Sequence, residues 1–180
     1  YTRFENVVTS LEFERIVNAG GPTRGQLVRP KDLKRPKSVG FIQCVGSRDE
    51  KRPYCSRICC TTSVSQAIAM KNRRPATNVF ILHRDIRTFG EREILYKEAR
   101  AKGVVFIRYS LDNKPTVTEA DGGLEVRVYD PILQKKVLIQ ADVINLATAV
   151  VPPENSRLAA FYKLPVNADN FFMEAHAKLR

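Results

Sequence analysis

Residues 38–60 read SVGFIQCVGSRDEKRPYCSRICC, and this stretch decides the fold. The first part is mainly apolar and suited to a pleated sheet, so it predicts a buried strand over residues 38–45. The polar loop that follows contains Gly46 and Pro53, both of which favour turns. Apolar side chains then recur at helical spacing over residues 60–68, which predicts a helix that begins near the last two cysteines.

The same alternation of strand and helix continues along the chain. The pattern predicts a strand over residues 78–82, a helix over 91–102 and a strand over 104–108. Gly103 stands between that helix and the last strand, where glycine commonly ends a helix. A strand–helix–strand–helix–strand order is typical of a parallel sheet covered by helices, so we predict an α/β fold.

Residues 115–147 show a different pattern. Residues 124–129 alternate apolar and polar side chains, as a half-exposed strand does, and short strands over 115–119 and 136–140 flank them. These segments predict an antiparallel β-meander. The apolar run 142–147 then predicts a buried strand that returns to the main sheet. We therefore expect a Rossmann-like, three-layer domain with a parallel sheet plus an antiparallel β-meander.

The two ends of the chain are expected to lie outside this domain. Thr9 and Glu12 fit a capping box, which predicts a short helix over residues 10–18. Residues 21–37 are basic and are interrupted by Pro and Gly, as linkers are. We expect three parts: residues 1–37, an arm with a basic linker; residues 38–153, the Rossmann-like domain; and residues 154–180, a return arm with a short helix and an extended tail.

Composition excludes several functional classes. The chain of 180 residues has 30 Lys and Arg against 19 Asp and Glu, a formal net charge of +11. Its densest basic run, residues 24–37, is broken by Pro and Gly and lacks interleaved aromatic side chains, so we predict no nucleic-acid partner. No apolar run approaches the roughly 18 residues of a membrane span, and no signal peptide is visible. These features indicate a cytoplasmic protein. Because the sequence begins without Met, we expect it to be part of a longer chain.

All the cysteines lie close together in sequence, at Cys44, Cys55, Cys59 and Cys60. In a chain without a secretion signal, such clustering favours a metal site over disulfides. A cubane iron–sulfur cluster needs four thiolates, whereas structural zinc usually takes two Cys-x2-Cys pairs, and this spacing is absent here. The spacing leaves three interpretations open: an iron–sulfur cluster, a zinc site, or idle or redox-active thiols.

The cysteine loop takes the place that a nucleotide has in other Rossmann-like domains. There the first strand leads into a G-x-G-x-x-G turn and a helix whose amino terminus holds a pyrophosphate. Here residues 44–50 read CVGSRDE, so the glycine triplet is missing. A strand end that faces a helix amino terminus still favours negative charge, which four thiolates would supply. Basic side chains nearby would help to hold such a site, namely Arg48, Lys51, Arg52 and Arg57.

Two motifs resemble the cluster motif of the A-subunit family of heterodisulfide reductases. They are residues 41–49, FIQCVGSRD, and residues 54–60, YCSRICC. Three further segments are similar to the same family, in the same order along the chain: residues 8–14, 85–90 and 171–180. The resemblance therefore covers nearly the whole chain.

The resemblance implies an iron–sulfur flavoprotein similar to thioredoxin reductase, in which a nucleotide-type domain is inserted into the FAD domain. This chain is similar to that inserted domain with short arms into the FAD domain. The family's [4Fe–4S] ligands match Cys44, Cys55, Cys59 and Cys60, and the residues expected around the cluster are Gly46, Ser47, Arg48, Tyr54 and Arg57. The residues expected on the FAD side are Thr148, Ala149 and His176, with Ala149 standing where the family usually has Gly.

The resemblance also implies a function. We expect an electron-transfer domain of an FAD and iron–sulfur oxidoreductase, in which the cluster relays electrons to or from FAD. The expected partners are the remainder of the FAD domain and other redox subunits of a heterodisulfide-reductase-like complex, and no residue of this chain is expected to be catalytic by itself. Two alternatives belong to other classes: a structural or pyridine-nucleotide-type docking domain, and a zinc-stabilised interaction module.

Overall fold

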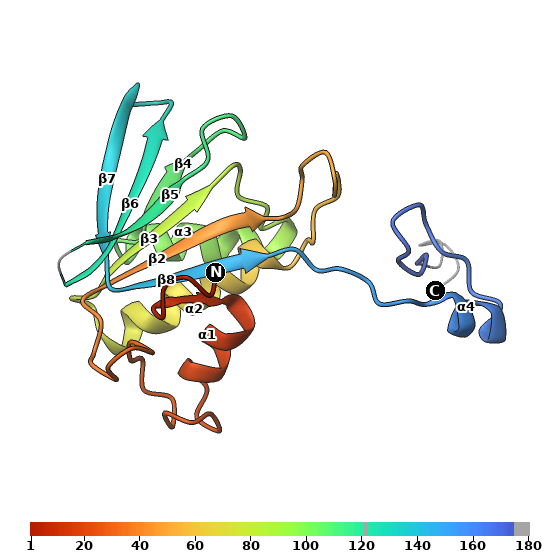
Figure 1. The fold of residues 1–180 in the computed structure, drawn as a ribbon, viewed down its shortest axis with the longest axis horizontal. Coiled ribbons are helices and arrows are strands. Elements are labelled where there is room, and N and C mark those ends of the chain that lie inside the picture. The colour runs from red at the N-terminus through yellow and green to blue at the C-terminus, as the bar shows by residue number, and fades with distance from the viewer. Residues whose placement is uncertain (121, 175–180) are drawn as a thin grey trace. The chain divides into compact units, whose positions relative to one another are not determined.

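In the computed structural model, which describes residues 1–120 and 122–174, the chain divides into two compact units. The first unit comprises residues 1–148 and the second residues 149–180 (Figure 1). The elements of the first unit, in chain order, are β1 (Val7–Thr9), α1 (Ser10–Val17), β2 (Ser38–Val45), α2 (Cys59–Arg73), β3 (Asn78–His83), the 3-10 helix η1 (Gly90–Arg92), α3 (Glu93–Ala101), β4 (Val105–Arg108), β5 (Thr116–Ala120), β6 (Gly123–Asp130), β7 (Lys135–Ala141) and β8 (Val143–Thr148).

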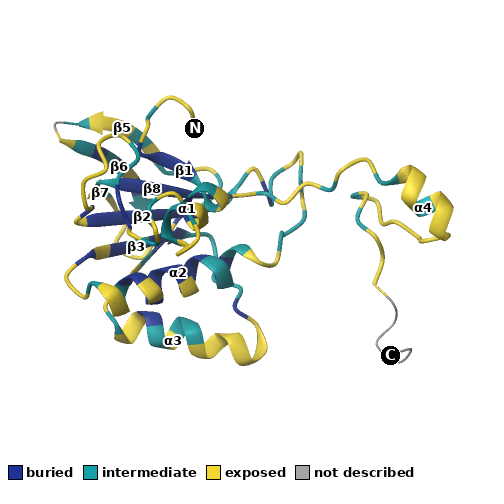
Figure 2. Cartoon of the chain, turned by 90° about the horizontal axis from the view of Figure 1, so that it is seen from below, coloured by how far each residue is buried: buried dark blue, intermediate teal, exposed yellow. Residues whose placement is uncertain are grey.

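The first unit has three layers. Its central sheet is parallel and runs in the order β1-β8-β2-β3-β4, while β5, β6 and β7 form a separate antiparallel sheet. Figure 2 shows α2 and α3 on one side of the central sheet and the antiparallel sheet on the other. This arrangement confirms the predicted α/β class, the meander and the return of the last strand to the main sheet.

Each face of the central sheet has its own hydrophobic core. Phe41 of β2 and Ile81 of β3 pack in the core beneath the helices. Their neighbours Ile42 and Leu82 pack in the core beneath the antiparallel sheet. Side chains alternate between the two faces of a strand, and both faces are covered here. This is why the strand sequences read as continuous apolar runs rather than as an alternation.

The amino-terminal segment belongs to the first unit. β1 pairs in parallel with β8 at the edge of the sheet. The predicted capping box is confirmed: the Thr9 side chain accepts from the Glu12 N–H, and the Glu12 carboxylate accepts from the Thr9 N–H over 2.7 Å. Residues 1–37, which the sequence indicates to be an arm and linker, thus contribute a strand and a helix to this unit.

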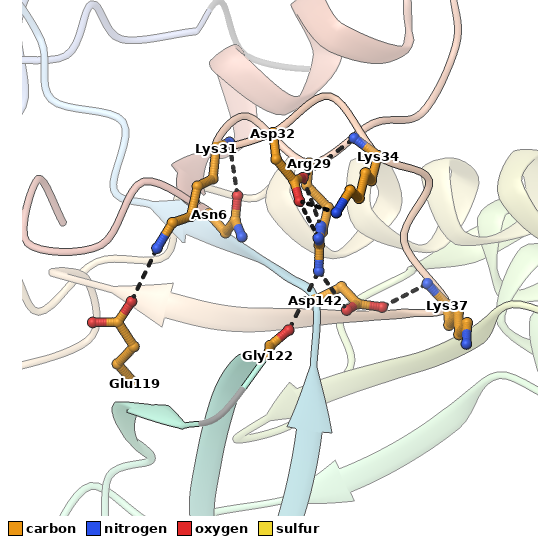
Figure 3. A network of polar contacts seen from close by, with 9 residues as sticks. All are labelled: Asn6, Arg29, Lys31, Asp32, Lys34, Lys37, Glu119, Gly122 and Asp142. Atoms are coloured by element: carbon orange, nitrogen blue, oxygen red, sulfur yellow. Dashed lines mark hydrogen bonds and ion pairs between the residues drawn. The ribbon is translucent and has the colours of Figure 1, made fainter.

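The basic segment before β2 is fastened to the amino end of the central sheet (Figure 3). Arg29 pairs with Asp32 and, over 3.3 Å, with Asp142 at the start of β8. The other carboxylate oxygen of Asp142 accepts the backbone N–H of Lys37 over 2.6 Å. Within the segment Val28 is 8% exposed. The ion pairs neutralise part of the segment's positive charge. They hold the segment at the amino end of the sheet, which is the end opposite the cysteines.

A buried polar chain fixes α1 and α2 to β8. Asn145 of β8 accepts from the Ser10 hydroxyl over 2.8 Å and donates to Gln66 of α2 over 3.2 Å. Gln66 donates in turn to Glu14 of α1 over 2.6 Å. A buried amide without a hydrogen-bond partner costs free energy, so this series of hydrogen bonds favours one position of α2 on the sheet. The position of α2 matters because the helix begins with two cysteines.

The second unit has little core of its own. Its described residues form α4 (Ser156–Tyr162) and a bridge between Val166 and Phe172. Several large apolar side chains are exposed, among them Phe161 at 80%. The predicted short helix is confirmed, and residues 175–180 lie outside the described residues. Across the described part of the chain, no helix combines the length and the apolar character that crossing a bilayer would need.

Candidate metal centre

The four cysteines gather at the carboxyl end of the parallel sheet. Cys44 is the penultimate residue of β2, Cys59 and Cys60 open α2, and Cys55 lies in the loop between these elements. In open α/β sheets, ligands bind in the crevice at this end. All four cysteines are free thiols. The sequence placed them at a strand–helix junction, and the structure has them there.

The backbone around the cysteines takes left-handed conformations that residues other than glycine rarely adopt. The φ angle is 60° at Cys44, 58° at Arg48 and 64° at Arg57, and Gly46 has 72°. The pairing of β2 with β8 shifts its register after Ile42, so the strand is irregular where Cys44 lies. Each such non-glycine residue costs on the order of 1 kcal/mol, and such strain concentrates at functional sites. Three of the nine such residues in the described part of the chain lie at or close to the cysteines.

Backbone hydrogen bonds close the loop between β2 and α2. The Arg48 N–H donates to the Tyr54 carbonyl over 3.1 Å, which joins the outgoing and returning halves of the loop. Ser47 is 4% exposed, and its N–H lies 3.4 Å from the Cys44 carbonyl. The loop that holds Cys55 is thus a hydrogen-bonded structure rather than an open excursion.

Each cysteine sulfur has a polar neighbour from this unit. The contacts come from the loop itself, from the segment after β3 and from the end of β8. They are Cys44 Sγ to Arg48 Nη1 at 3.9 Å, Cys55 Sγ to the Arg57 N–H at 3.4 Å, Cys59 Sγ to the Thr148 carbonyl at 3.9 Å, and Cys60 Sγ to the Asp85 carbonyl at 3.9 Å.

Burial favours the protonated form of Cys44, Cys59 and Cys60 in the metal-free chain. It raises the pKa of Cys44 and of Cys59, and it raises the pKa of Cys60 to about 11. The charges that Cys44, Cys55 and Cys59 would take raise the pKa of Cys60 as well. The four sulfurs therefore share one electrostatic neighbourhood, and a cationic group bound there would favour their thiolate forms.

The sulfurs are not arranged around a single ion. Among residues 1–120 and 122–174, no three His, Cys, Asp or Glu side chains lie close enough together to hold one metal ion. Zinc draws four ligands to one centre at about 2.3 Å from each sulfur. A cubane cluster instead binds one cysteine at each of four irons.

Asp85, in the segment after β3, connects two basic side chains beside the cysteines. It forms ion pairs with Arg48 and, over 2.8 Å, with Arg87. Burial opposes the ionised form, but hydrogen bonds from Arg87 and Arg48 prevail and hold the pKa of Asp85 below its usual range. Arg84 also donates to the Arg48 carbonyl over 2.5 Å. The segment after β3 thus forms a second wall of the site.

This second wall could not be located from sequence spacing. Asp85 and Arg48 are 37 residues apart. They meet because β2 and β3 are neighbours in the sheet and their following loops emerge at the same edge. Neighbouring parallel strands have their carboxyl ends side by side. The contact between Asp85 and Arg48 could therefore be predicted only from the order of the strands in the sheet.

The structure also reveals buried polar side chains in β2, α2 and β3 that sequence reasoning missed. Gln43 of β2 and Ser63 of α2 are both 0% exposed, and their side-chain polar atoms have no hydrogen-bond partner. Nδ1 of His83, the last residue of β3, is likewise buried without a partner. Burial lowers the pKa of His83 to about 4, so the imidazole is neutral at physiological pH.

We predict that the metal-free chain loses stability between pH 7 and pH 4.5 because of His83. Its pKa is about 4 in the folded chain, against a reference of 6.5. Between these values the unfolded chain binds a proton that the folded chain does not, so stability is present above the upper value and falls as pH is lowered. The loss is about 1–3 kcal/mol, since the side chain is only partly buried.

Urea unfolding at both pH values measures this loss. His83→Phe, which preserves an aromatic ring opposite Phe106, should show a smaller loss than the wild-type chain. Equal losses in the two proteins would contradict the assignment to His83.

Of the residues expected on the FAD side, the structure describes Thr148 and Ala149. Thr148 ends β8 and is exposed, with its carbonyl beside Cys59. Ala149 begins the second unit, and His176 lies outside the described residues. Their role stays a prediction.

Comparisons with known proteins give relatives over the whole chain, although no family model matches it. The A subunit of the H(2):CoB-CoM heterodisulfide,ferredoxin reductase from Methanothermobacter thermautotrophicus is 43% identical over 187 residues, which is 100% of this chain. The iron–sulfur A subunit of the CoB–CoM heterodisulfide reductase from Methanocaldococcus jannaschii is 43% identical over 99% of it. A protein of Archaeoglobus profundus, named as similar to the A subunit of heterodisulfide reductase, is 32% identical over 97% of it. The chain spans 28% of the length of each of these relatives.

Two solved structures share the fold. Thioredoxin reductase of T. acidophilum matches 93% of this chain and 43% of its own with a TM-score of 0.52 and 12% identity. L-lysine 6-monooxygenase of Pseudomonas syringae matches 93% of this chain and 46% of its own with a TM-score of 0.50 and 14% identity. At such identities the likeness concerns the fold alone.

Proposed function

This chain belongs to the A-subunit family of heterodisulfide reductases, whose members it matches over its whole length. We propose that it is an electron-transfer domain of an FAD and iron–sulfur oxidoreductase. The relatives are named as reductases, which supports a redox role. The observation on which the proposal depends most is the gathering of four free cysteines where the fold usually binds its ligand.

Within this proposal, Cys44, Cys55, Cys59 and Cys60 hold a [4Fe–4S] cluster. Two features of the chain support the assignment: the charges of the other three cysteines act on Cys60, and all four cysteines lie at or between the end of β2 and the start of α2. The Methanocaldococcus jannaschii relative is named as an iron–sulfur protein. When bound, such a cluster supplies one-electron transfer.

The other residues of the site would hold and tune the cluster. The closed loop from Ser47 to Tyr54 positions Cys55, and the core beneath α2 excludes water from Cys60. Arg48 places a guanidinium 3.9 Å from Cys44 Sγ, where it offsets the negative charge of four thiolates. Asp85 orients that guanidinium. These roles need no catalytic residue from this chain.

The cluster would exchange electrons with FAD bound by the remainder of the longer protein, and with other redox subunits of a heterodisulfide-reductase-like complex. Thr148, Ala149 and His176 are proposed to face the flavin, and the complex is proposed to be cytoplasmic. The carbonyl of Thr148 lies 3.9 Å from Cys59 Sγ, which supports a short path between the cluster and residues on the flavin side.

Anaerobic reconstitution of the chain with iron and sulfide tests the proposal. We expect about four irons and four sulfides per chain, with a broad visible absorption that bleaches on reduction by dithionite. A chain that takes up no iron but retains zinc would contradict the proposal and favour a zinc-stabilised interaction module. A chain that takes up neither metal but binds NADH would favour a pyridine-nucleotide-type docking domain.

A further inference from the structure

The side chain of Gln43 is buried in a way that the metal-free chain does not explain. It is 0% exposed, and neither its amide nitrogen nor its amide oxygen has a hydrogen-bond partner. A buried polar group without a partner costs about 1–3 kcal/mol. The only other buried side-chain nitrogen or oxygen atoms without partners in the described part of the chain are Ser63 Oγ and His83 Nδ1. A glutamine in an otherwise apolar strand therefore needs a reason.

The three residues share one layer of the fold. In β2, Val39 and Phe41 face the core beneath the helices, so alternation places Gln43 on the same face. The ladder ends with the pair of Ile42 and Leu82, and Gln43 and His83 are the next residues of the two neighbouring strands. Ser63 is fully buried on α2.

Two of these residues are close to cysteines along their own elements. Gln43 precedes Cys44 in β2, and Ser63 is three residues after Cys60, which places both on the same side of α2. Cys60 is itself only 7% exposed and faces the same interior. The unpartnered polar atoms are thus concentrated at the cysteine end of the helix-facing layer, whereas Asn145 and Gln66, deeper in the layer, are paired with each other.

We propose that the side-chain amide of Gln43 donates a hydrogen bond to a sulfur of the cluster and raises the reduction potential of the cluster. The inference rests on the proposed function, because the acceptor is supplied only when the cluster is bound. A sulfur atom accepts hydrogen bonds more strongly as its negative charge grows, so the bond favours the reduced cluster. Gln43 tunes the cluster through this hydrogen bond and takes no part in proton transfer.

The substitution Gln43→Met tests the proposal because methionine has a similar volume and no donor. The metal-free variant should unfold at the same or a higher urea concentration than the wild-type chain, since an unpaired buried amide has been removed. The reconstituted variant should have a lower midpoint potential at unchanged iron content. The variant would thus keep or gain stability without the cluster and still lower the reduction potential of the bound cluster. A merely structural role of Gln43 would not lower the potential of a variant that is as stable as the wild-type chain.

Gln66→Met is the matched control. Gln66 is also buried, but its amide is bonded to Asn145 and Glu14. Its replacement should therefore lower the urea midpoint of the metal-free chain and leave the cluster potential unchanged.

A measurement on the wild-type chain keeps the inference testable even if Gln43→Met does not fold. In protein labelled with 15N at the glutamine side-chain amides, pulsed EPR of the reduced cluster should detect coupling to one amide nitrogen. Absence of this coupling, or an unshifted potential in Gln43→Met, overturns the inference while leaving the cluster assignment intact. Failure of the wild-type chain to bind iron overturns both the proposed function and this inference.

Discussion

The Cys60→Ala variant is expected to lose the iron–sulfur cluster while its sheets remain folded. Removing one of four thiolates leaves one iron without a protein ligand, so we expect the iron content after anaerobic reconstitution to fall from about four per chain to below about one. Alanine is the best helix former, and the substitution removes only one sulfur atom from the first turn of α2. Metal analysis and circular dichroism measure the two properties separately.

Ser65→Ala is a suitable control for this experiment. Ser65 lies on the same helix but is exposed. Its variant should bind as much iron as the wild-type chain. Equivalent losses are expected for alanine variants of the three other cysteines, because a four-thiolate site needs each of them. Full iron content in any one of the four variants would contradict its assignment as a ligand.

The sequence was sufficient for the sheet because local pattern and tertiary environment agree there. The strand predicted over residues 38–45 is observed as β2 with the same bounds. The helix predicted over 91–102 is observed as α3, and the short 3-10 helix η1 precedes it. Patterns of apolar residues therefore predicted most elements of the first unit to within a few residues.

The segment before β2 shows where local pattern fails. Residues 21–37 are basic and interrupted by Pro and Gly, which is typical of a linker. In the structure Leu27 and Val28 are buried, and Arg29 reaches Asp142 at the start of a strand more than a hundred residues away. Two isolated apolar residues give no periodic signal, and an ion pair with a distant aspartate leaves no trace in local sequence.

Some residues of the candidate site could be predicted from local sequence pattern, and others could not. The cysteines could be placed because they flank a strand end and a helix start that are themselves predictable. The contributions of Asp85 and Gln43 could not be, because one depends on the order of strands in the sheet and the other on which side chains lack partners. Sequence thus predicts the ligands of the site, and the structure adds the residues that would tune it.

Arg48 is the tuning residue with the largest expected effect. Its guanidinium lies 3.9 Å from Cys44 Sγ, and its side chain is 16% exposed. We expect Arg48→Met to lower the midpoint potential of the bound cluster by on the order of 30–120 mV. This range corresponds to about 1–3 kcal/mol for a unit charge roughly 6 Å from the cluster at an effective dielectric constant between water and a protein surface. A redox titration followed by visible absorption measures the shift.

The matched control is Arg35→Met, which makes the same change in net charge at an exposed position just before the amino end of β2. That end of the strand is opposite the cysteines, and salt screens exposed charges beyond about 8 Å at physiological ionic strength. The potential of the control should therefore match that of the wild-type chain. Equal shifts in both variants would mean that net charge alone matters. No shift in Arg48→Met would mean that its guanidinium is neutralised by Asp85 and has no influence on the cluster. We expect a lower potential in Arg48→Met and an unchanged potential in Arg35→Met. Asp85 also pairs with Arg87, so it offsets the charge of Arg48 only in part.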